Sequence, residues 1–303
     1  MKHLYIIGNG FDIFTGLRTR YMDFRHWLQY AYPFIYENMY AAYEMKGEWW
    51  HNFEIQLGKF DVKRYVQKFA APNKSVEEIL KEIEEKKAFI EKNKIPPDLH
   101  RSSSPCANRL RGLLDVLQYC FERWIEDSTS VINNPKYTHI ERNDSFFINF
   151  NYTDVLQWLY GIKDEQILYI HGRASKHEHL VFGHNSHHLG GMMGFDEEQT
   201  LFELDKYNKN PYEYIFKHDE LPVILSDVEN VHVYGFSISE VDEDYLDWME
   251  KNTPQNCKWE FSWYSEEDID RVERFVLDHW TLKGRYSLMQ LQEISREEAC
   301  RDS

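Results

Sequence analysis

Short apolar runs that end in glycine or a polar residue recur along the chain. One occupies residues 3–7, and the others follow residue 140, at 145–150, 167–172, 179–185, 230–239 and 259–264. Between them, helical patterns are present at 153–161, 241–252 and 266–280. Apolar runs of this length are typical of strands buried on both faces. Their alternation with helices predicts an α/β fold with a parallel, Rossmann-like sheet flanked by helices.

A long block without strand patterns separates the first run from the rest. Residues 21–43 are rich in aromatic side chains, and 76–94 and 110–125 carry apolar residues at helical spacing. We interpret this block as a helical insertion after the first strand. The expected domains are an α/β domain of residues 1–20 and 140–303 and a helical subdomain of residues 21–139.

The charge balance of the chain disfavours direct binding of nucleic acid. Lys and Arg number 35 against 51 Asp and Glu, a net charge of −16 over 303 residues, whereas nucleic-acid binding depends mainly on basic side chains. The four cysteines show no CxxC spacing, which gives no support to a zinc ribbon or a disulfide framework. No apolar stretch reaches the ~18 residues of a membrane span. We therefore expect a cytoplasmic protein without membrane contacts.

The glycine-rich segment after the first strand is a candidate ligand loop, because ligands of parallel sheets bind beyond the carboxyl ends of the strands. Gly8 and Gly10 would let backbone N–H groups approach a phosphate or a ribose. The dinucleotide fingerprint GxGxxG is absent, because Ile13 stands in place of its third glycine. A structural turn is an equal alternative, and Asp12 would either contact a ribose or cap a helix.

The segment NFNYTD, residues 149–154, carries polar residues at a second strand end. Asn149 and Asn151 flank one aromatic residue, so on a strand they face the same side. Buried amides are costly without partners, which favours a ligand role for Asn151. Thr153 or Asp154 is expected to cap the following helix.

A third strand end, YGFSIS at 234–239, offers Ser237 and Ser239 after Gly235. Their hydroxyls would bond a nucleotide or cap the helix that begins near residue 241. A nucleophilic serine gains no support, because the G-x-S-x-G elbow is absent.

A histidine follows a fourth strand, in IHG at 170–172. An imidazole with a pKa near neutral suits a general base. Residues 171–188 hold six histidines, but no carboxylate completes a recognised metal-ligand pattern and the HEH of residues 177–179 lacks i, i+4 spacing, so we expect no metal. The six are His171, His177, His179, His184, His187 and His188.

These motifs together resemble the AbiH family of bacterial phage-abortive-infection proteins. The resemblance spans essentially the full length and rests on LYIIGNGFD, WWHNFE, NFNYTD, IHG, FGHN and VYGFSIS followed by Asp and Tyr. The family's GHSL appears here as GFSI, so Phe236 replaces a histidine. The resemblance implies an anti-phage function.

AbiH proteins in turn resemble a divergent sirtuin-like fold that binds NAD as a nucleotide substrate. The paired-cysteine zinc module of deacetylating sirtuins is absent, so the resemblance implies an NADase that releases nicotinamide and ADP-ribose rather than a deacetylase. It implies His171 as general base, assisted by Asn151 and Asp12. The residues implied to bind NAD are Gly8, Asn9, Gly10, Phe11, Asn149, Tyr152, Asp154, Gly172, Gly235 and Ser237.

Two other functions stay open. The pocket could sense NAD, ADP-ribose or a signal nucleotide without turnover, or the histidines of 171–188 could serve a metal-dependent nuclease or phosphoesterase. An effector that destroys NAD must be held inactive before infection. We therefore expect either a homo-oligomer or a partner defence protein that controls the activity.

Overall fold

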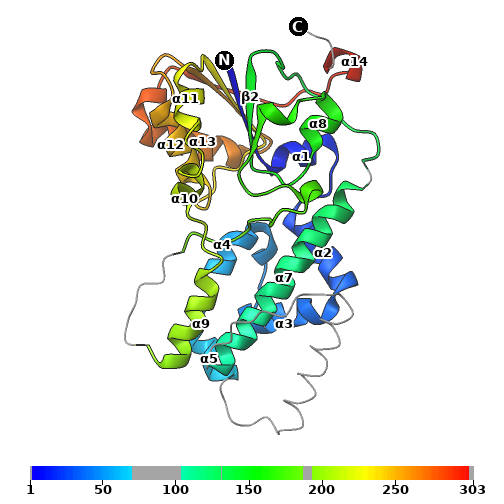
Figure 1. Ribbon diagram of the computed structural model, residues 1–303, viewed down its shortest axis with the longest axis vertical. Coiled ribbons are helices and arrows are strands. Elements are labelled where there is room, and N and C mark those ends of the chain that lie inside the picture. The colour runs from blue at the N-terminus through cyan, green and yellow to red at the C-terminus, as the bar shows by residue number, and fades with distance from the viewer. Residues whose placement is uncertain (1, 70–103, 131, 187–192, 300–303) are drawn as a thin grey trace. The chain divides into compact units, whose positions relative to one another are not determined.

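The structure is a computed structural model that describes residues 2–69, 104–130, 132–186 and 193–299 (Figure 1). The chain divides into two compact units. The first, here called the sheet unit, comprises Met1–Asp23, Trp124–Phe182 and Lys209–Ser303, and the second, the helical unit, comprises Phe24–Arg123 and Gly183–Asn208. Residues 183–208, which the sequence pattern assigned to the α/β domain, cluster with the helical unit.

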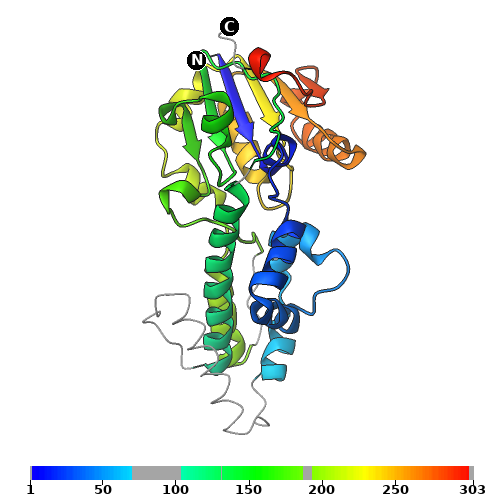
Figure 2. The same cartoon turned by 90° about the vertical axis from the view of Figure 1, so that its right-hand side faces the viewer.

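The sheet unit contains six parallel strands in the order β3-β2-β1-β4-β5-β6. Figure 2 shows them side by side, with β1 in blue. The expected parallel α/β sheet is confirmed, and its order is the doubly wound one of Rossmann folds. The strands are β1 (His3–Ile7), β2 (Ser145–Asn149), β3 (Ile167–Tyr169), β4 (Asn230–Tyr234), β5 (Lys258–Ser262) and β6 (Tyr286–Met289).

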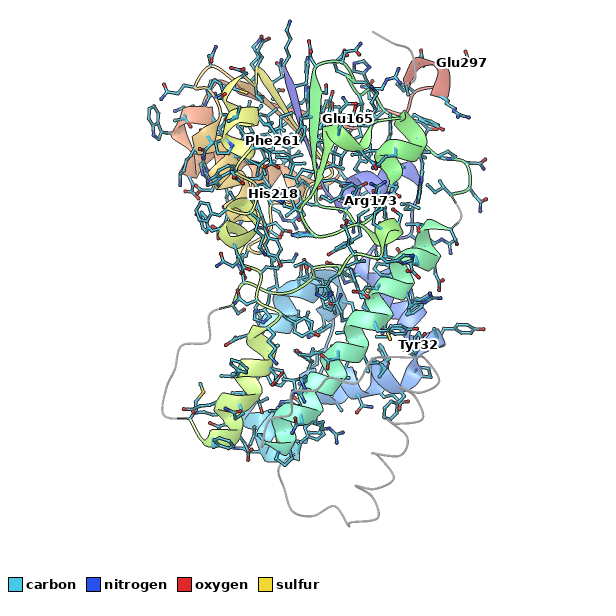
Figure 3. All side chains as sticks on the ribbon, viewed as in Figure 1. Tyr32, Glu165, Arg173, His218, Phe261 and Glu297 are labelled. Carbon is cyan, nitrogen blue, oxygen red and sulfur yellow. The ribbon has the colours of Figure 1, made fainter. Side chains whose placement is uncertain are left out.

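Both faces of the sheet are buried. On β1, Leu4 and Ile6 belong to the core on one face, while Tyr5 and Ile7 belong to the core on the other, as the period of two requires. Figure 1 shows α11, α12 and α13 on the first face and α1 with α8 on the second. Side chains fill the space between the sheet and these helices, including Phe261 of β5 (Figure 3).

Short helices follow most strands of the sheet unit. The expected helices at 153–161, 241–252 and 266–280 are present as α8, α12 and α13. The full set is α1 (Asn9–Thr15), α8 (Val155–Tyr160), η2 (Asp164–Gln166), η3 (Ala174–Lys176), α10 (Pro211–Ile215), α11 (Leu221–Ser226), α12 (Glu243–Asn252), α13 (Glu266–Asp278), η4 (Trp280–Leu282) and α14 (Arg296–Ala299).

The remaining helices lie wholly or mostly in the helical unit. They are α2 (Tyr21–Ala31), α3 (Pro33–Tyr43), η1 (Trp49–Asn52), α4 (Phe53–Gly58), α5 (Val62–Phe69), α7 (Pro105–Thr129) and α9 (Phe195–Asp205). The aromatic residues between 21 and 43 are helical as expected, with a break before Pro33. The helix expected at 76–94 lies outside the described residues.

Aromatic rings form the core of the helical unit. The ring of Phe24 is fully buried and meets those of Trp50, Phe53 and Phe121 edge to face, with centroids 5.8, 5.9 and 5.5 Å apart. Edge-to-face pairs add to the stability that burial alone provides. The WWHNFE segment therefore contributes packing to this unit through Trp50 and Phe53.

The strand expected at 179–185 is wrong. Leu180 and Phe182 are buried with a period of two, but the backbone bonds of this segment go to three separate partners. The N–H of Val181 donates to His171, that of Gly183 to the Glu54 carboxylate and that of His184 to Tyr207, so no single neighbouring strand pairs with it. Residues 179–185 thus have the apolar alternation of a strand but lack a continuous series of backbone hydrogen bonds to one neighbouring strand.

Phe24→Ala tests the aromatic core. Removing a fully buried ring is expected to cost about 3–5 kcal/mol of stability through lost burial and the cavity that remains. The measurement is chemical unfolding of the full chain. Tyr30→Ala is the matched control on the same helix, because Tyr30 is 92% exposed and its loss is expected to cost less than about 0.5 kcal/mol. Equal effects of the two substitutions would contradict this assignment of the core.

Candidate functional site

The sheet reverses its winding direction between β1 and β4, and the loops that leave these two strands meet there. The N–H of Gly8 donates to the carbonyl of Tyr234 (3.0 Å), and the N–H of Gly10 donates to that of Gly235 (2.7 Å). A Cβ on Gly8 would lie 2.5 Å from the Cα of Phe236, and one on Gly10 would lie 2.8 Å from the oxygen of Gly235. The glycines therefore let the two loops pack backbone to backbone.

This contact bears on the expected phosphate loop. The N–H of Phe11 also stays within the loop and donates to the carbonyl of Gly8 (2.9 Å), and the side chain of Asn9 donates to the carbonyl of Thr19 (2.8 Å). Phosphate held by the N–H groups of Gly8 and Gly10 would require the two loops to separate. The phosphate role of this segment stays a prediction.

Gly235 and Gly172, two more of the expected site residues, have left-handed backbone conformations, with φ of +62° and +87°. The N–H of Gly235 donates to Oγ of Ser262 (2.7 Å). A Cβ on Gly172 would lie 2.5 Å from the carbonyl oxygen of His179. Backbone geometry thus accounts for both glycines. Ser237, by contrast, is exposed to solvent.

A buried carboxylate network joins α1 to the loop after β2. Asp12 is 2% exposed; its Oδ1 accepts from Nδ2 of Asn151 (2.8 Å) and its Oδ2 from Oγ1 of Thr153 (2.7 Å). Nδ2 of Asn151 also donates to the carbonyl of Gly8 (3.0 Å), and its N–H donates to Oδ1 of Asn149 (3.0 Å). The structure thus brings together three expected site residues, Asp12, Asn149 and Asn151. The carboxylate of Asp12 does not cap α1.

The protonation of Asp12 is unusual. Burial raises the pKa of this carboxyl to about 7, while the hydrogen bonds from Thr153 and Asn151 oppose the shift. The hydroxyl of Thr153 can either donate or accept a hydrogen bond, so this contact suits both charge states of the acid. Asp12 is therefore a group that exchanges a proton near neutral pH.

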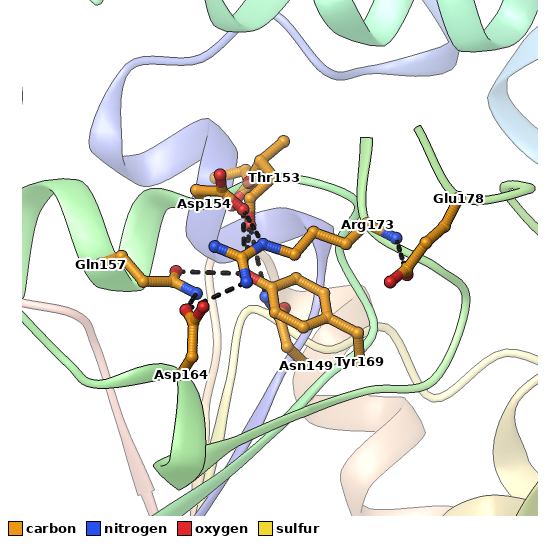
Figure 4. A network of polar contacts seen from close by, with 9 residues as sticks. Asn149, Thr153, Asp154, Gln157, Asp164, Tyr169, Arg173 and Glu178 are labelled. Atoms are coloured by element: carbon orange, nitrogen blue, oxygen red, sulfur yellow. Dashed lines mark hydrogen bonds and ion pairs between the residues drawn. The ribbon is translucent and has the colours of Figure 1, made fainter. Parts of the chain in front are cut away.

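Arg173, which the sequence reasoning missed, organises the next polar network (Figure 4). Its Nε lies 2.6 Å from Oδ1 of Asp154, and another guanidinium nitrogen lies 3.0 Å from Oδ1 of Asp164. The hydroxyl of Tyr169 donates to Asp154 (3.3 Å), and its ring lies beneath the guanidinium. The carboxylate of Asp154, expected to bind cofactor, is therefore ion-paired. Its position directly after the IHG motif was the available signal for Arg173.

His171 lies in a second buried cluster. Its ring hydrogen-bonds to the backbone of Phe150, and its Nε2 faces Oδ1 of Asp242 at 3.9 Å. Burial and the nearby charge of Lys209 hold the pKa of this imidazole well below its usual value. The expectation of a near-neutral pKa for His171 is wrong. The near-neutral pKa belongs to Asp12 instead.

A cavity of ≈ 140 Å³ lies beside the two networks of the NFNYTD segment. Typical ligand sites measure about 300–1,000 Å³, so this one has room for a small group rather than for a dinucleotide. Among the expected site residues, Tyr152 and Asp154 line it. The complete lining is Glu126, Thr129, Tyr152, Thr153, Asp154, Trp158, Ala174, Ser175 and His177.

The histidine-rich segment does not act as one cluster in the described residues. His184 is buried in the helical unit, where its Nδ1 accepts from the N–H of Ser186 (3.2 Å) and its Nε2 bonds the carbonyl of Leu204 (3.2 Å). Glu54 accepts the N–H of Gly183 nearby (3.1 Å), so the WWHNFE and FGHN motifs are joined structurally. His187 and His188 lie outside the described residues. Across the described ranges, no group of three or more His, Cys, Asp or Glu side chains is arranged to hold a metal ion.

Comparison with known proteins identifies one family. The family model described as "Bacteriophage abortive infection AbiH" matches residues 4–263, which confirms the resemblance drawn from the motifs. No curated protein and no solved structure matches the chain significantly. Within the part of the chain that the structure describes, no helix combines the length and the apolar character needed to cross a bilayer.

Gly235→Ala tests the contact between the two loops. The new Cβ would lie 2.0 Å from the backbone nitrogen of Phe11 and would occupy a left-handed conformation, so we expect a loss of more than about 2 kcal/mol in chemical unfolding. Gly284→Ala is the control, because Gly284 has φ +80° but open space around it. That control isolates backbone strain alone, about 1 kcal/mol. Equal losses would show that the loops are not tightly packed.

Asp12→Asn tests the buried carboxyl. The pKa of Asp12 is raised in the folded state from 3.8 to about 7, so folding binds a proton, and the stability of the native protein falls as pH rises between these values. The substitution should remove this pH-dependent loss of stability. At about 1.36 kcal/mol per pKa unit, the loss amounts to at most about 4 kcal/mol. Chemical unfolding at pH 4.5, 6 and 7.5 measures it, with the exposed Asp144→Asn as control. A difference between wild type and Asp12→Asn that stays constant with pH would refute the shifted pKa.

Proposed function

Since the chain belongs to the AbiH family of bacteriophage abortive infection proteins, we propose that it is a cytoplasmic anti-phage effector that binds NAD and hydrolyses it to nicotinamide and ADP-ribose. The observation that carries the proposal is the buried Asp12–Asn151–Thr153 network beyond the carboxyl ends of β1 and β2. That edge of a doubly wound sheet is where nucleotides bind. A carboxyl with a pKa moved to about 7 is typical of a catalytic site.

The reaction consumes NAD⁺ and water and releases nicotinamide, ADP-ribose and a proton. The bond between nicotinamide and ribose breaks through an oxocarbenium-like state, so the protein must hold the ribose and bring water to its anomeric carbon. In this proposal, Asn151 orients the ribose or the water, and Asp12 contacts the ribose or positions the water. His171 accepts the proton through its unprotonated Nε2.

The contact between the loops after β1 and β4 bears on how the proposed activity is regulated. The N–H groups of Gly8 and Gly10 bond to the loop after β4, so NAD phosphates gain access to them only when the loops separate. We propose that this closed form is inactive and that self-assembly or a partner defence protein opens it during infection.

The same observation favours a second function, the sensing of NAD or ADP-ribose without turnover. A protein whose loops open on binding a nucleotide could signal through that movement alone. A thermal shift with NAD or ADP-ribose, without release of nicotinamide, would favour sensing over hydrolysis.

Asn151→Ala tests the catalytic proposal. In phage-infected cells that carry the wild-type protein, we expect NAD to fall and nicotinamide and ADP-ribose to rise. The substitution should reduce the release of nicotinamide by about 10²-fold or more, as for a lost catalytic group. Liquid chromatography of cell extracts gives the measurement.

Asn143→Ala is the matched control, because Asn143 is an exposed asparagine of the sheet unit. It should retain both protection and release of nicotinamide. Because Asn151 is buried, circular dichroism must show that its variant folds, and His171→Gln gives an independent second variant. Protection without any loss of NAD in wild-type cells would reject the hydrolase.

A further inference from the structure

Two buried side chains and one partly buried side chain that carry or accept charge lie together in the sheet unit. Nε2 of His171 lies 3.9 Å from Oδ1 of Asp242, and the same oxygen lies 3.6 Å from Nζ of Lys209. The side chains of His171 and Lys209 are 3% and 2% exposed, and that of Asp242 is 17% exposed. Sequence reasoning selected only the histidine, so Lys209 and Asp242 add two charges to the surroundings of the proposed base.

Aromatic rings surround the histidine on its other sides. Tyrosine hydroxyls are neutral at pH 7, and burial raises the pKa of Tyr214 further. These rings therefore add no charge to those of Asp242 and Lys209 beside His171. The rings, with centroids 5.4, 6.2, 6.5 and 6.0 Å from that of His171, are those of Phe150, Tyr152, Tyr214 and Tyr245.

The geometry fixes which nitrogen of His171 is the acceptor. The ring donates one N–H to the backbone of Phe150, and Nε2 makes no hydrogen bond among the described residues. In the neutral imidazole Nε2 therefore carries the lone pair, and it faces the oxygen of Asp242. This buried, unprotonated nitrogen therefore faces the ion pair of Asp242 with Lys209.

The charges of Lys209 and Asp242 act on this nitrogen in opposite directions. With lysine positive, aspartate negative and histidine neutral, the buried cluster has no net charge. A proton on His171 would leave one uncompensated positive charge, which is costly at low dielectric. Without the lysine, the aspartate would instead attract a proton to the imidazole.

We propose that Lys209 and Asp242 are positioning residues that set the charge state of His171. Lys209 keeps the imidazole neutral and able to accept a proton, and Asp242 compensates the lysine and faces the imidazolium once it forms. The catalytic meaning of this arrangement rests on the proposed function. In the proposed step, the O–H bond of water or of a ribose hydroxyl breaks, its proton moves to Nε2, and its electron pair stays on the oxygen.

Nuclear magnetic resonance of the histidine ring nitrogens in the full chain tests the charge state without NAD. In the wild type we expect His171 to stay neutral from pH 5.5 to 8, with the proton on the nitrogen that faces Phe150. Lys209→Met should raise the pKa of His171 by at least one unit, a tenfold gain in proton affinity. The double variant Lys209→Met/Asp242→Asn should return it to the neutral form. Lys251→Met, an exposed lysine of the same unit paired with Asp247, is the control and should change nothing.

Each outcome of these measurements either supports the proposal or overturns it. A protonated His171 in the wild type at pH 6 would overturn the proposal even if no variant folds, and so would a folded Lys209→Met protein whose His171 does not shift. If Lys209 were merely structural, its substitution would change the stability of the protein, and the pKa of His171 would be the same in the wild type, the single variant and the double variant. If the charge pattern holds but the protein releases no nicotinamide in infected cells, the proposed hydrolase fails while the assignment of Lys209 and Asp242 stands.

Discussion

The burial of the Asp12 carboxyl, with no cation beside it in the described part of the chain, is the constraint on which this site depends. A buried carboxyl is tolerated only when its oxygens are hydrogen-bonded. Asn151 and Thr153 supply those bonds, and because they lie in the loop after β2, they tie that loop to α1. Asn151 also bonds the carbonyl of Gly8, so one amide holds the carboxyl and the glycine loop together. The pKa of about 7 for Asp12 is the electrostatic consequence.

The glycine loop is in turn held by the loop after β4. In many doubly wound folds the crevice between the two central strands receives the ligand, but here backbone contacts of Gly10 with Gly235 bridge it. A side chain at either position would push the loops apart. The glycines thus serve a closed state first, and a role toward a nucleotide follows only if that state opens. A phosphate bound at these N–H groups would have to compete with the same backbone contacts.

Much of the fold could be predicted from the sequence, because buried parallel strands and amphipathic helices leave periodic patterns. The coming together of Asp12, Asn149 and Asn151 also followed from their positions at strand ends. Lys209 and Asp242 could not be identified as partners of His171 in this way, because both lie far from it along the chain and a single Lys or Asp has no distinctive local pattern. Arg173 directly follows the IHG motif, but its pairing with Asp154 and Asp164 leaves no periodic pattern. The apolar alternation around Leu180 led to a wrong strand prediction, because a strand also needs a neighbouring strand that pairs with it along its length.

The pKa values of Asp12 and His171 are shifted in opposite directions. Desolvation favours the neutral form of any buried group, so it raises the pKa of an acid and lowers that of a base. Asp12 is consequently moved up to about 7, and His171 is moved well below its usual range. Near pH 7 the Asp12 carboxyl is therefore partly protonated, and the His171 imidazole is neutral. The order found here reverses the ordinary one for Asp and His: burial accounts for the shift of Asp12, and burial together with the charge of Lys209 accounts for that of His171.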